Sequence, residues 1–328
     1  MSEFSVDTFR EHASRIESEV GRVIVGQGDV VRHVLISILA GGHVLLEGVP
    51  GLGKTMLIRT LGQALDLKFS RIQFTPDLMP ADILGTEILS DEDGRREFRF
   101  RPGPLFSNLV LADEINRATP KTQSALLEAM QESSITIAQT TYQLEEPFFV
   151  MATQNPIEME GTYPLPEAQL DRFFFKVNVD LPNVNEMVEI LDRTTGKESP
   201  AANKAVSGGD IIQMRALART TPIASHVKEY IAKLTLATHP EDPNASPLVK
   251  KYIRYGVSPR GGQALVLGAK VTALLAGRYN VSFEDVHAVA KAALRHRLLL
   301  NFDGLAEAIK PDDVINELVG ALQVSQVS

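Results

Sequence analysis

A glycine-rich segment at residues 48–55 constrains the fold of this chain more than any other feature. It reads Gly48-Val49-Pro50-Gly51-Leu52-Gly53-Lys54-Thr55 and fits the pattern G-x-x-x-x-G-K-[ST]. Glycines at this spacing let backbone N–H groups surround a polyphosphate, while the lysine reaches the β and γ oxygens and the threonine hydroxyl holds Mg²⁺. We therefore take residues 48–55, together with the adjoining Met56, as candidate nucleotide-binding residues.

The segments on either side of this loop predict how it is held. The apolar run His43-Val44-Leu45-Leu46 reads as a buried strand, and residues 55–61 are apolar at helical spacing. A phosphate in the loop would therefore also lie at a helix N-terminus, where orphan N–H groups and the helix dipole favour an anion. Strand, loop and helix in this order favour a polyphosphate site over an ordinary glycine-rich turn.

The composition limits the classes of protein to which this chain can belong. With 328 residues and 44% hydrophobic residues it can bury a sizeable core, and its length suggests two domains. The net charge of −8 argues against binding nucleic acid by a generally basic surface, although a local basic groove stays open. The absence of cysteine excludes disulfides and thiolate metal sites, and the seven histidines show no metal-binding spacing.

Two further observations concern where the chain works. Residues 1–10 show no basic and apolar signal segment, and no apolar run is long enough to cross a bilayer. A protein that uses ATP also needs a compartment that supplies it. We therefore expect a cytoplasmic protein with no membrane span.

The first half of the chain alternates between strand and helix patterns. This alternation is the signature of an α/β fold in which helices cover both faces of a parallel sheet. Two amphipathic helices precede the first strand, and the short apolar turn Val23-Ile24-Val25-Gly26-Gln27 lies between them. The expected strands are residues 43–46, 68–74, 109–113 and 148–153, and the expected helices are residues 6–20, 29–40, 56–65 and 121–132.

Two hairpins are expected to interrupt this α/β pattern. Residues 87–100 form two alternating segments around Asp93-Gly94, which is a strong hairpin signal. Residues 134–145 read similarly, with arms at 135–137 and 142–144. Both hairpins are therefore predicted as inserts in the α/β domain.

The strand signals largely stop after Pro182. Residues 199–209 are rich in Ser, Gly, Ala and Pro and read as an exposed connection. The chain is therefore predicted to form an α/β nucleotide-binding domain at residues 1–182 and a small all-α domain at residues 183–328. The helices expected in the second domain are residues 225–238, 248–255, 259–276, 283–300 and 312–322.

Two strands of the predicted sheet end in polar residues that suit hydrolysis. Asp113 and Glu114 follow the apolar run 109–112, and ligands bind at the carboxyl edge of parallel sheets. Asp113 would hold Mg²⁺, directly or through water, and Glu114 would take a proton from the attacking water. Asn155 follows the strand at 148–153 and could orient that water without adding charge, whereas Asn155-Pro156 in isolation would only open a turn.

Three arginines could stabilise negative charge that develops on a phosphate. They are Arg117, Arg172 and Arg260, and a guanidinium matches phosphate oxygens with its fork of donors. By composition alone each of them would be a surface salt-bridge residue. Only the sequence around them favours a catalytic role.

The order of these motifs resembles that of AAA+ ATPases. Residues 48–55, Asp113-Glu114, Asn155 and Arg260 follow one another as Walker A, Walker B, sensor 1 and sensor 2 do. The chain is more specifically similar to the MoxR family. That resemblance rests on five segments, which are residues 73–85, 113–118, 152–156, 161–173 and 258–260.

The resemblance implies an ATPase core with a helical lid, assembled as a homo-oligomer, typically a hexameric ring, with ATP and Mg²⁺ between subunits. In it Arg172 matches the finger presented to the neighbour's γ-phosphate, Arg260 matches the lid arginine that senses nucleotide in its own subunit, and the role of Arg117 is open. Val25, Gly26 and Gln27 fall where such ATPases form part of the adenine pocket. The two hairpins correspond to inserts that project toward the ring pore or a partner.

Relatives in this family act as chaperone-like remodellers, often with partners that carry a von Willebrand factor A domain, and assist maturation or metal insertion. The sequence has no D-x-S-x-S segment, so such a partner would be another chain. One alternative is an ATP-gated binding switch or scaffold. A nucleic-acid motor is a further alternative, which the net charge disfavours, although Arg95, Arg96, Arg99 and Arg101 form a basic cluster.

Overall fold

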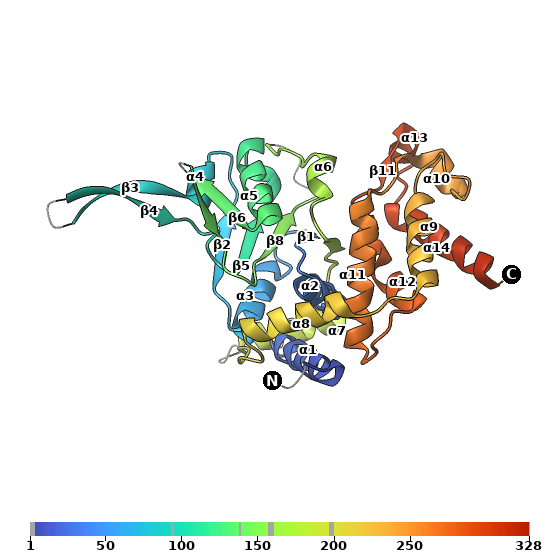
Figure 1. Ribbon diagram of the computed structural model, residues 1–328, viewed down its shortest axis with the longest axis horizontal. Helices are drawn as coiled ribbons and strands as arrows, with labels where there is room; N and C mark the ends of the chain where they lie inside the picture. Colours follow the sequence, from blue (N-terminus) through green and yellow to red (C-terminus); the bar gives the residue numbers. More distant parts are fainter. Residues whose placement is uncertain (1–3, 93–94, 138, 157–160, 197–199, 328) are drawn as a thin grey trace.

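A five-stranded parallel sheet forms the centre of the nucleotide-binding half (Figure 1). The structure is a computed structural model that describes residues 4–92, 95–137, 139–156, 161–196 and 200–327. The strands lie in the order β2-β5-β8-β1-β9, and every neighbouring pair is parallel, so their carboxyl ends share one edge. They are β1 (Val44–Glu47), β2 (Phe69–Gln73), β5 (Leu109–Asp113), β8 (Phe149–Gln154) and β9 (Phe175–Asn178).

The sheet is buried on both faces, which explains the continuous apolar runs of its strands. Successive side chains point to opposite faces, so Leu46, Leu111 and Met151 enter one hydrophobic core while Leu45 and Val150 enter another. The first core lies under α1 (Val6–Gly21), α2 (Gly28–Ala40) and α3 (Lys54–Leu65). The second lies under α5 (Pro120–Glu132). The α/β fold expected from the sequence is confirmed.

Two antiparallel hairpins leave the α/β body, as predicted. The longer one pairs β3 (Gly85–Glu92) with β4 (Arg95–Pro102) and extends away from the molecule (Figure 1). The shorter one pairs β6 (Ser134–Ile137) with β7 (Thr140–Gln143). The predicted Asp93-Gly94 turn lies outside the described residues. The short elements α4 (Pro80–Leu84), η1 (Ile115–Arg117) and α6 (Glu167–Leu170) complete this half.

The rest of the described chain is mostly helical. Its elements are α7 (Val184–Thr195), α8 (Gly208–Thr220), α9 (Ser225–Leu236), α10 (Pro247–Tyr252), β10 (Ile253–Tyr255), α11 (Pro259–Leu275), α12 (Phe283–Leu294), β11 (Leu299–Leu300), α13 (Phe302–Ala306) and α14 (Pro311–Val327). Across all described residues, none of the helices is long and apolar enough to span a bilayer.

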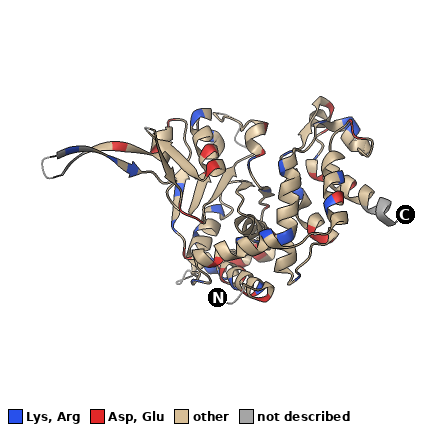
Figure 2. Ribbon diagram, in the orientation of Figure 1, with Lys and Arg blue, Asp and Glu red and all other residues tan. Residues whose placement is uncertain are grey.

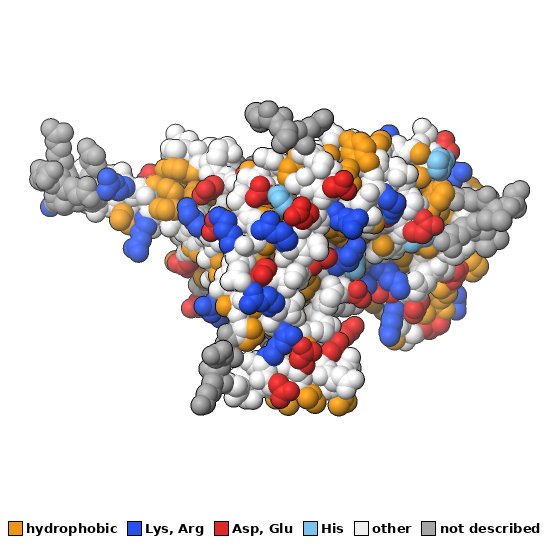
Figure 3. All heavy atoms as spheres, turned by 90° about the horizontal axis from the view of Figure 1, so that it is seen from below, with side chains coloured by type: hydrophobic (Ala, Val, Ile, Leu, Met, Phe, Trp, Pro, Cys, Tyr) orange, Lys and Arg blue, Asp and Glu red, His pale blue; other side chains and the backbone are white. Residues whose placement is uncertain are grey.

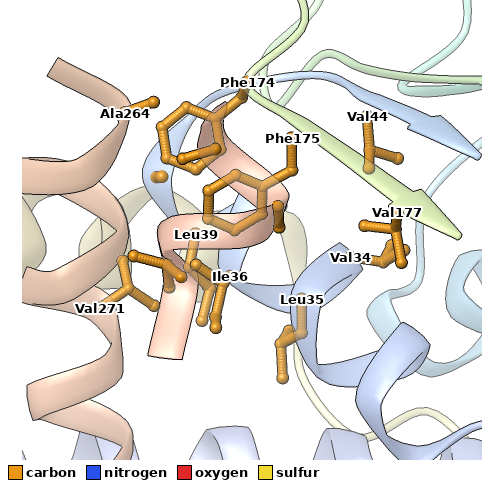
Figure 4. Close-up of a cluster of buried hydrophobic side chains, with 14 of the residues drawn as sticks. Val34, Leu35, Ile36, Leu39, Val44, Phe174, Phe175, Val177, Ala264 and Val271 are labelled. Carbon is orange, nitrogen blue, oxygen red and sulfur yellow. The ribbon is translucent and has the colours of Figure 1, made fainter. Parts of the chain in front are cut away.

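The helical region shares a core with the sheet. Phe174 and Phe175 lie between helix α2, represented by Val34 and Leu39, and helix α11, represented by Val271 (Figure 4). The glycine at position 268 lets α11 approach, because a Cβ there would lie 2.9 Å from the ring of Phe175. The helical region is therefore packed on the sheet rather than attached by a linker alone.

Several elements differ from the sequence predictions. Strand β9 and helices α7 and α8 were not predicted, and α8 begins at Gly208 inside the expected connection 199–209. The helices expected to reach residues 255 and 300 end at Tyr252 and Leu294, and the last residues of both expected ranges, 253–255 and 299–300, pair instead as β10 and β11. Backbone pairing between distant segments overrides local helical spacing there.

Candidate active site

The glycine-rich loop joins β1 to α3 at the carboxyl edge of the sheet. Gly51 and Gly53 have φ angles of 86° and 75°, in the left-handed region that glycine adopts without strain. A Cβ at Gly48 would lie 2.7 Å from the carbonyl oxygen of Val179, so the chain is closely packed where the loop begins. Helix α3 begins at Lys54, and its first N–H groups have no partner within the helix. The loop thus presents an anion-binding helix end.

The Lys54 side chain is held against this loop. Its Nζ donates a hydrogen bond to the carbonyl oxygen of Gly48 at 2.5 Å. Burial lowers the pKa of Lys54, while the negative charges of Asp113, Glu114 and Glu47 act in the opposite direction. The ammonium group therefore lies at the meeting point of the loop and the acidic strand ends.

A threonine on β8 fixes the two carboxylates at the end of β5. The Oγ1 atom of Thr153 donates to Asp113 Oδ1 at 2.6 Å and accepts from the Glu114 N–H at 2.8 Å. Glu114 has a φ angle of 55°, so the chain turns sharply out of the strand at this residue. This turn directs the two adjacent side chains into one site instead of onto opposite faces.

Two residues of β2 that the sequence reasoning assigned no role also bind these carboxylates. Arg71 donates to Asp113 Oδ2 from Nη2 at 2.8 Å and from Nε at 3.2 Å. Gln73 donates to Glu114 Oε2 at 2.9 Å, and Arg117 donates to the same oxygen at 3.0 Å. The signal for Arg71 and Gln73 was their alternation with the buried residues on β2, the neighbour of β5.

These side chains enclose a cavity of about 250 Å³ at the sheet edge. It brings together eight predicted residues from three separate segments, which supports the predicted grouping. Asn155 is buried and lies in this lining. The lining consists of Pro50, Gly51, Gly53, Lys54, Thr55, Arg71, Gln73, Asp113, Glu114, Thr153 and Asn155.

The donor set of this cavity fits a magnesium ion. Thr55 supplies a hydroxyl oxygen and Asp113 a carboxylate oxygen, and both line the same cavity as Lys54. Mg²⁺ prefers oxygen ligands and is usually held by one or two protein groups together with phosphate oxygens. Thr55 and Asp113 are therefore the residues that would hold it.

A second cavity, of about 450 Å³, lies between the segment 25–30 and the segment 178–186. Val25, Gly26 and Gln27, the predicted part of an adenine pocket, all line it together with Pro182 and Glu186. Gln27 Nε2 donates to the carbonyl oxygen of Leu52 at 2.8 Å, which ties this cavity to the phosphate loop. Val49 and Met56 are not among the described residues that line either cavity, and Met56 is exposed.

Arg172 and Arg260 lie together in a third cavity, of about 240 Å³. The described residues that line the phosphate-loop cavity include neither of them. Arg260 was expected to sense nucleotide in its own subunit, and that role stays a prediction; in the structure Arg260 lines the same cavity as Arg172. The reason is a contact at the start of α11, where Ser258 Oγ donates to both carboxylate oxygens of Asp171 at 2.9 Å.

Arg297 makes this contact rigid. Its Nε donates to Asp171 Oδ1 at 2.8 Å, and its other nitrogens donate to the carbonyl oxygens of Asp171, Phe173, Phe174 and Ala293. The side chain is 3% exposed, and burial lowers its pKa while Asp171 raises it. Arg260, 47% exposed, lies 3.8 Å from Asp171. The segment that carries Arg172 is thus fixed to the helical region.

Comparison with known proteins decides the family. The model for the ATPase family associated with various cellular activities (AAA) matches residues 43–175, and the AAA lid domain model matches residues 245–318. The Mycobacterium tuberculosis protein Chaperone MoxR1 is 45% identical over 94% of this chain and 81% of its own. The chain belongs to the MoxR family of AAA ATPases.

Further relatives agree with this MoxR assignment. Protein MoxR of Paracoccus denitrificans is 34% identical over 90% of this chain and 91% of its own length. A solved structure of a candidate ATPase from Cytophaga hutchinsonii is 42% identical, covers 96% of both chains and superposes with a TM-score of 0.90. The MoxR resemblance, the AAA fold with its helical lid, and ATPase activity are therefore confirmed. The roles of individual site residues stay predictions.

Proposed function

We propose that this MoxR-family ATPase hydrolyses ATP in a site shared by two subunits of a ring, typically a hexamer. One observation carries the proposal: Arg172 and Arg260 lie together in a cavity whose described lining does not overlap that of the phosphate-loop cavity. A chain whose guanidinium groups do not reach its own phosphate loop can use them on a neighbour's nucleotide. An arginine of this kind can raise turnover by about 10³ to 10⁵.

The chain's own residues divide the chemistry between them. The loop N–H groups and Lys54 bind the polyphosphate, and Val25 to Gln27 border the space for the base. Glu114 accepts the proton of the attacking water, and Asn155 holds that water by hydrogen bonding. Thr55 and Asp113 would hold Mg²⁺, which would supply positive charge to the bound polyphosphate. Arg172 and Arg260 of the neighbour stabilise the charge on the γ-phosphate.

The coupling of hydrolysis to motion follows from the contact between Asp171 and the helical region. Ser258 and Arg297 join the segment that carries Arg172 to helices α11 and α12. Loss of the γ-phosphate releases both guanidinium groups from one neighbour at once. The helical region, which we propose as a lid domain at residues 183–328 on a core at residues 1–182, then moves relative to that neighbour.

We propose that this motion remodels a protein partner in the cytoplasm. The relative named Chaperone MoxR1 supports this reading. A partner with a von Willebrand factor A domain, and a role in maturation or metal insertion, are the specific outcomes to look for. The alternative, an ATP-gated scaffold, would show slow turnover that no partner stimulates, together with ATP-dependent assembly.

Mixing two inactive variants tests the shared site. Lys54→Ala removes the phosphate ligand, and Arg172→Ala removes the guanidinium, so each subunit of a mixed ring supplies what its neighbour lacks. We expect phosphate release to recover in this mixture and also when Arg260→Ala replaces Arg172→Ala. A mixture of Lys54→Ala with Glu114→Gln is the control and stays inactive. Both changes disable the phosphate-loop cavity, so no subunit in that mixture has an intact one.

Two outcomes would count against the proposal. If rings exchange subunits and neither mixture recovers, the arginines do not act on a neighbour. If the Arg172→Ala mixture alone recovers, Arg260 acts within its own subunit, as the family resemblance first implied.

A further inference from the structure

A buried glutamine binds the turn that follows the candidate base. Gln123 lies in the first turn of α5 and is 0% exposed. Its Nε2 donates to the carbonyl oxygens of Ile115 and Ala118 at 3.2 and 3.1 Å. The same nitrogen donates to the carbonyl oxygen of Tyr163 at 2.9 Å. Gln123 therefore joins two segments of the chain that are distant in sequence.

The hydrogen bonds of Gln123 are all made by one end of its amide. Three carbonyl oxygens surround that end, which identifies it as the NH₂ group, since a carbonyl oxygen can only accept. The Oε1 atom is buried and has no hydrogen-bond partner within the described part of the chain. A buried acceptor without a partner destabilises a fold. The side chain is thus placed for what its NH₂ group holds.

The first segment that Gln123 holds is the turn that orients Glu114. Arg117 ends the short helix η1 and donates from Nη1 to Glu114 Oε2 at 3.0 Å. The Arg117 N–H donates to the Glu114 carbonyl oxygen at 2.9 Å. Gln123 bonds the residue at the start of η1 and the residue just after its end. It therefore fixes the turn from which Arg117 reaches the carboxylate.

The second segment leads to Arg172. The Tyr163 N–H donates to the Asn116 carbonyl oxygen at 2.6 Å, which adds a second bond to the η1 turn. Leu165, between two prolines that restrict the backbone, is buried in the hydrophobic core that also contains the η1 turn. Helix α6 follows, and the carbonyl oxygen of its residue Gln169 accepts from the Arg172 N–H at 3.2 Å. Arg172 is thus connected to the η1 turn by a short, packed segment.

This segment also meets the helical region at its far end. Asp171 accepts from Ser258 at 2.9 Å and from Arg297 at 2.8 Å. Figure 1 shows α6 on the side of the α/β half that faces α11. We call residues 163–172 the bridge segment. It contacts the turn of the base at one end and the helical region at the other.

Direct contact is the route by which a change at Arg172 can reach Glu114. Exposed charges separated by more than about 10 Å are largely screened at physiological salt. Figure 2 shows basic and acidic residues interspersed along the ribbon, and Figure 3 shows the same mixture on the face seen from below. Mixed signs weaken any long-range field further. The bridge segment supplies the contacts that such a route needs.

We propose that Gln123 is a positioning residue that couples Glu114 to the bridge segment. Engagement of Arg172 on a neighbour's nucleotide then sets the base of the subunit that carries this arginine. The proposal rests on the shared site proposed above and adds a route from one active site to the next. While Arg172 binds a γ-phosphate, the bridge segment is held and the η1 turn keeps Arg117 on the Glu114 carboxylate. When the γ-phosphate leaves, the bridge segment and the η1 turn move together and displace the base.

Gln123→Met tests the end of this route at the base. Methionine has nearly the same length as glutamine but donates no hydrogen bond. We expect turnover to fall by about tenfold to a hundredfold, because a small misplacement of a reacting group has an effect of that size. The KM for ATP should stay unchanged, because Lys54 and the loop are intact. Steady-state phosphate release measures both quantities.

Thr122→Val is the matched control for this change. Thr122 is the preceding residue of α5, is equally buried, and donates to the carbonyl oxygen of Leu78 at 2.7 Å. Leu78 is outside the described lining of the phosphate-loop cavity. Both variants lose a buried hydrogen bond, so both should unfold at lower denaturant concentration, but only Gln123→Met should lose turnover. Equal turnover in the two variants would overturn the proposal.

Mixed rings show which subunit depends on Gln123. In the Lys54→Ala and Arg172→Ala mixture, the Arg172→Ala subunit supplies Glu114 and the other subunit supplies the arginine. Gln123→Met in the Arg172→Ala subunit should lower the recovered phosphate release by about tenfold or more. In the Lys54→Ala subunit it should have little effect, because the contact with the helical region still holds that arginine. An equal loss in both placements would indicate a merely structural role and contradict the proposal.

A fluorescent residue tests the end of the route at the arginine and does not depend on the folding of Gln123→Met. The chain contains no tryptophan, so Tyr163→Trp places a single fluorophore in the bridge segment. A chain with Tyr163→Trp and Lys54→Ala lacks the lysine that binds its own ATP, and Arg172→Ala chains supply the bound nucleotide. ATP should change the tryptophan emission of this mixture. Adding Arg172→Ala to the labelled chain should abolish the change, and an unaltered response would overturn the proposal.

The failure of this coupling and the failure of the shared site give different results. If the Lys54→Ala and Arg172→Ala mixture recovers activity but Gln123→Met behaves as Thr122→Val does, the coupling fails and the shared site stands. If the mixture stays inactive while Gln123→Met alone lowers turnover at constant KM, the shared site fails and the positioning of Glu114 by Gln123 stands.

Discussion

The phosphate-loop cavity and the arginine cavity differ in the charged groups that they gather. The first gathers Lys54 with two carboxylates, and partners within the chain bind those carboxylates from β2 and β8. The second gathers guanidinium groups around a single carboxylate, Asp171, and Arg297 is the buried partner of that carboxylate. This difference is the basis of our proposal that one chain supplies the base and the phosphate ligands while its neighbour supplies positive charge.

The largest expected effect tests the chemistry of the phosphate-loop cavity. Glu114→Gln removes the proton acceptor but keeps the size of the side chain. We expect turnover to fall by about 10³-fold, with the affinity for ATP close to wild type because Lys54 and the loop are intact. Phosphate release and binding of a fluorescent ATP analogue measure the two quantities.

Glu128→Gln, on the exposed side of α5, is the matched control for this change. It should leave both turnover and binding unaltered. If Glu114→Gln keeps near-normal turnover, Glu114 is not the base, and the proposed role of the phosphate-loop cavity in activating water is wrong.

The next effect tests the arginine cavity as a structural unit. Arg297→Ala removes a buried guanidinium and leaves Asp171 without its closest ion-pair partner. We expect a loss of stability of about 3–5 kcal/mol, as for other broken buried pairs. Denaturant unfolding measures it, with the exposed Arg59→Ala as control. A loss below 1 kcal/mol would mean that this contact does not hold the helical region in place.

The two cavities also differ in how far the sequence predicts them. Lys54, Thr55, Asp113, Glu114 and Asn155 each follow a strand, and parallel strands end at one edge, so their grouping could be predicted. The place of Arg260 depends on a packing contact between segments almost ninety residues apart, which the spacing of nearby residues does not encode.

The same distinction explains the elements that were missed. Strand β9 is short and begins at the last of three consecutive phenylalanines, so its length and pattern were too weak to identify it. Helix α7 has strong periodicity, but its apolar face meets solvent rather than a core. Arg71 and Gln73 look like ordinary exposed positions of a strand until β5 is placed beside them.

A smaller loss of stability is expected at acidic pH, and it should come from a histidine in the arginine cavity. His43 lines that cavity, accepts from the Val150 N–H at 3.0 Å and bonds the carbonyl oxygen of Met130. Burial lowers the pKa of His43 to about 4, and the positive charge of Arg215 acts in the same direction, while the Met130 bond opposes it.

The direction of the pH dependence follows from that pKa. The unfolded chain binds a proton at His43 below pH 6.5, whereas the folded chain does not until about pH 4. Stability is therefore complete above pH 6.5 and falls as the pH drops toward 4, by about 2 kcal/mol at pH 5. His43→Gln should flatten this dependence in denaturant unfolding, and the exposed His226→Gln should not. If the free energy of unfolding changes equally with pH in the two variants, His43 is not the group that causes the dependence.

The smallest effect returns to the phosphate-loop cavity and concerns Arg71. Its guanidinium bonds the same Asp113 oxygen that a magnesium ion could use, so it competes with the metal for that carboxylate. The Arg71 side chain is 48% exposed, and ion pairs of this exposure are worth below about 1 kcal/mol. Arg71→Gln should therefore lower the Mg²⁺ concentration needed for half-maximal nucleotide binding by no more than about fivefold. An increase in that concentration would show instead that Arg71 positions Asp113 for the metal. Arg71 would then be part of the metal site rather than a competitor of the metal for Asp113.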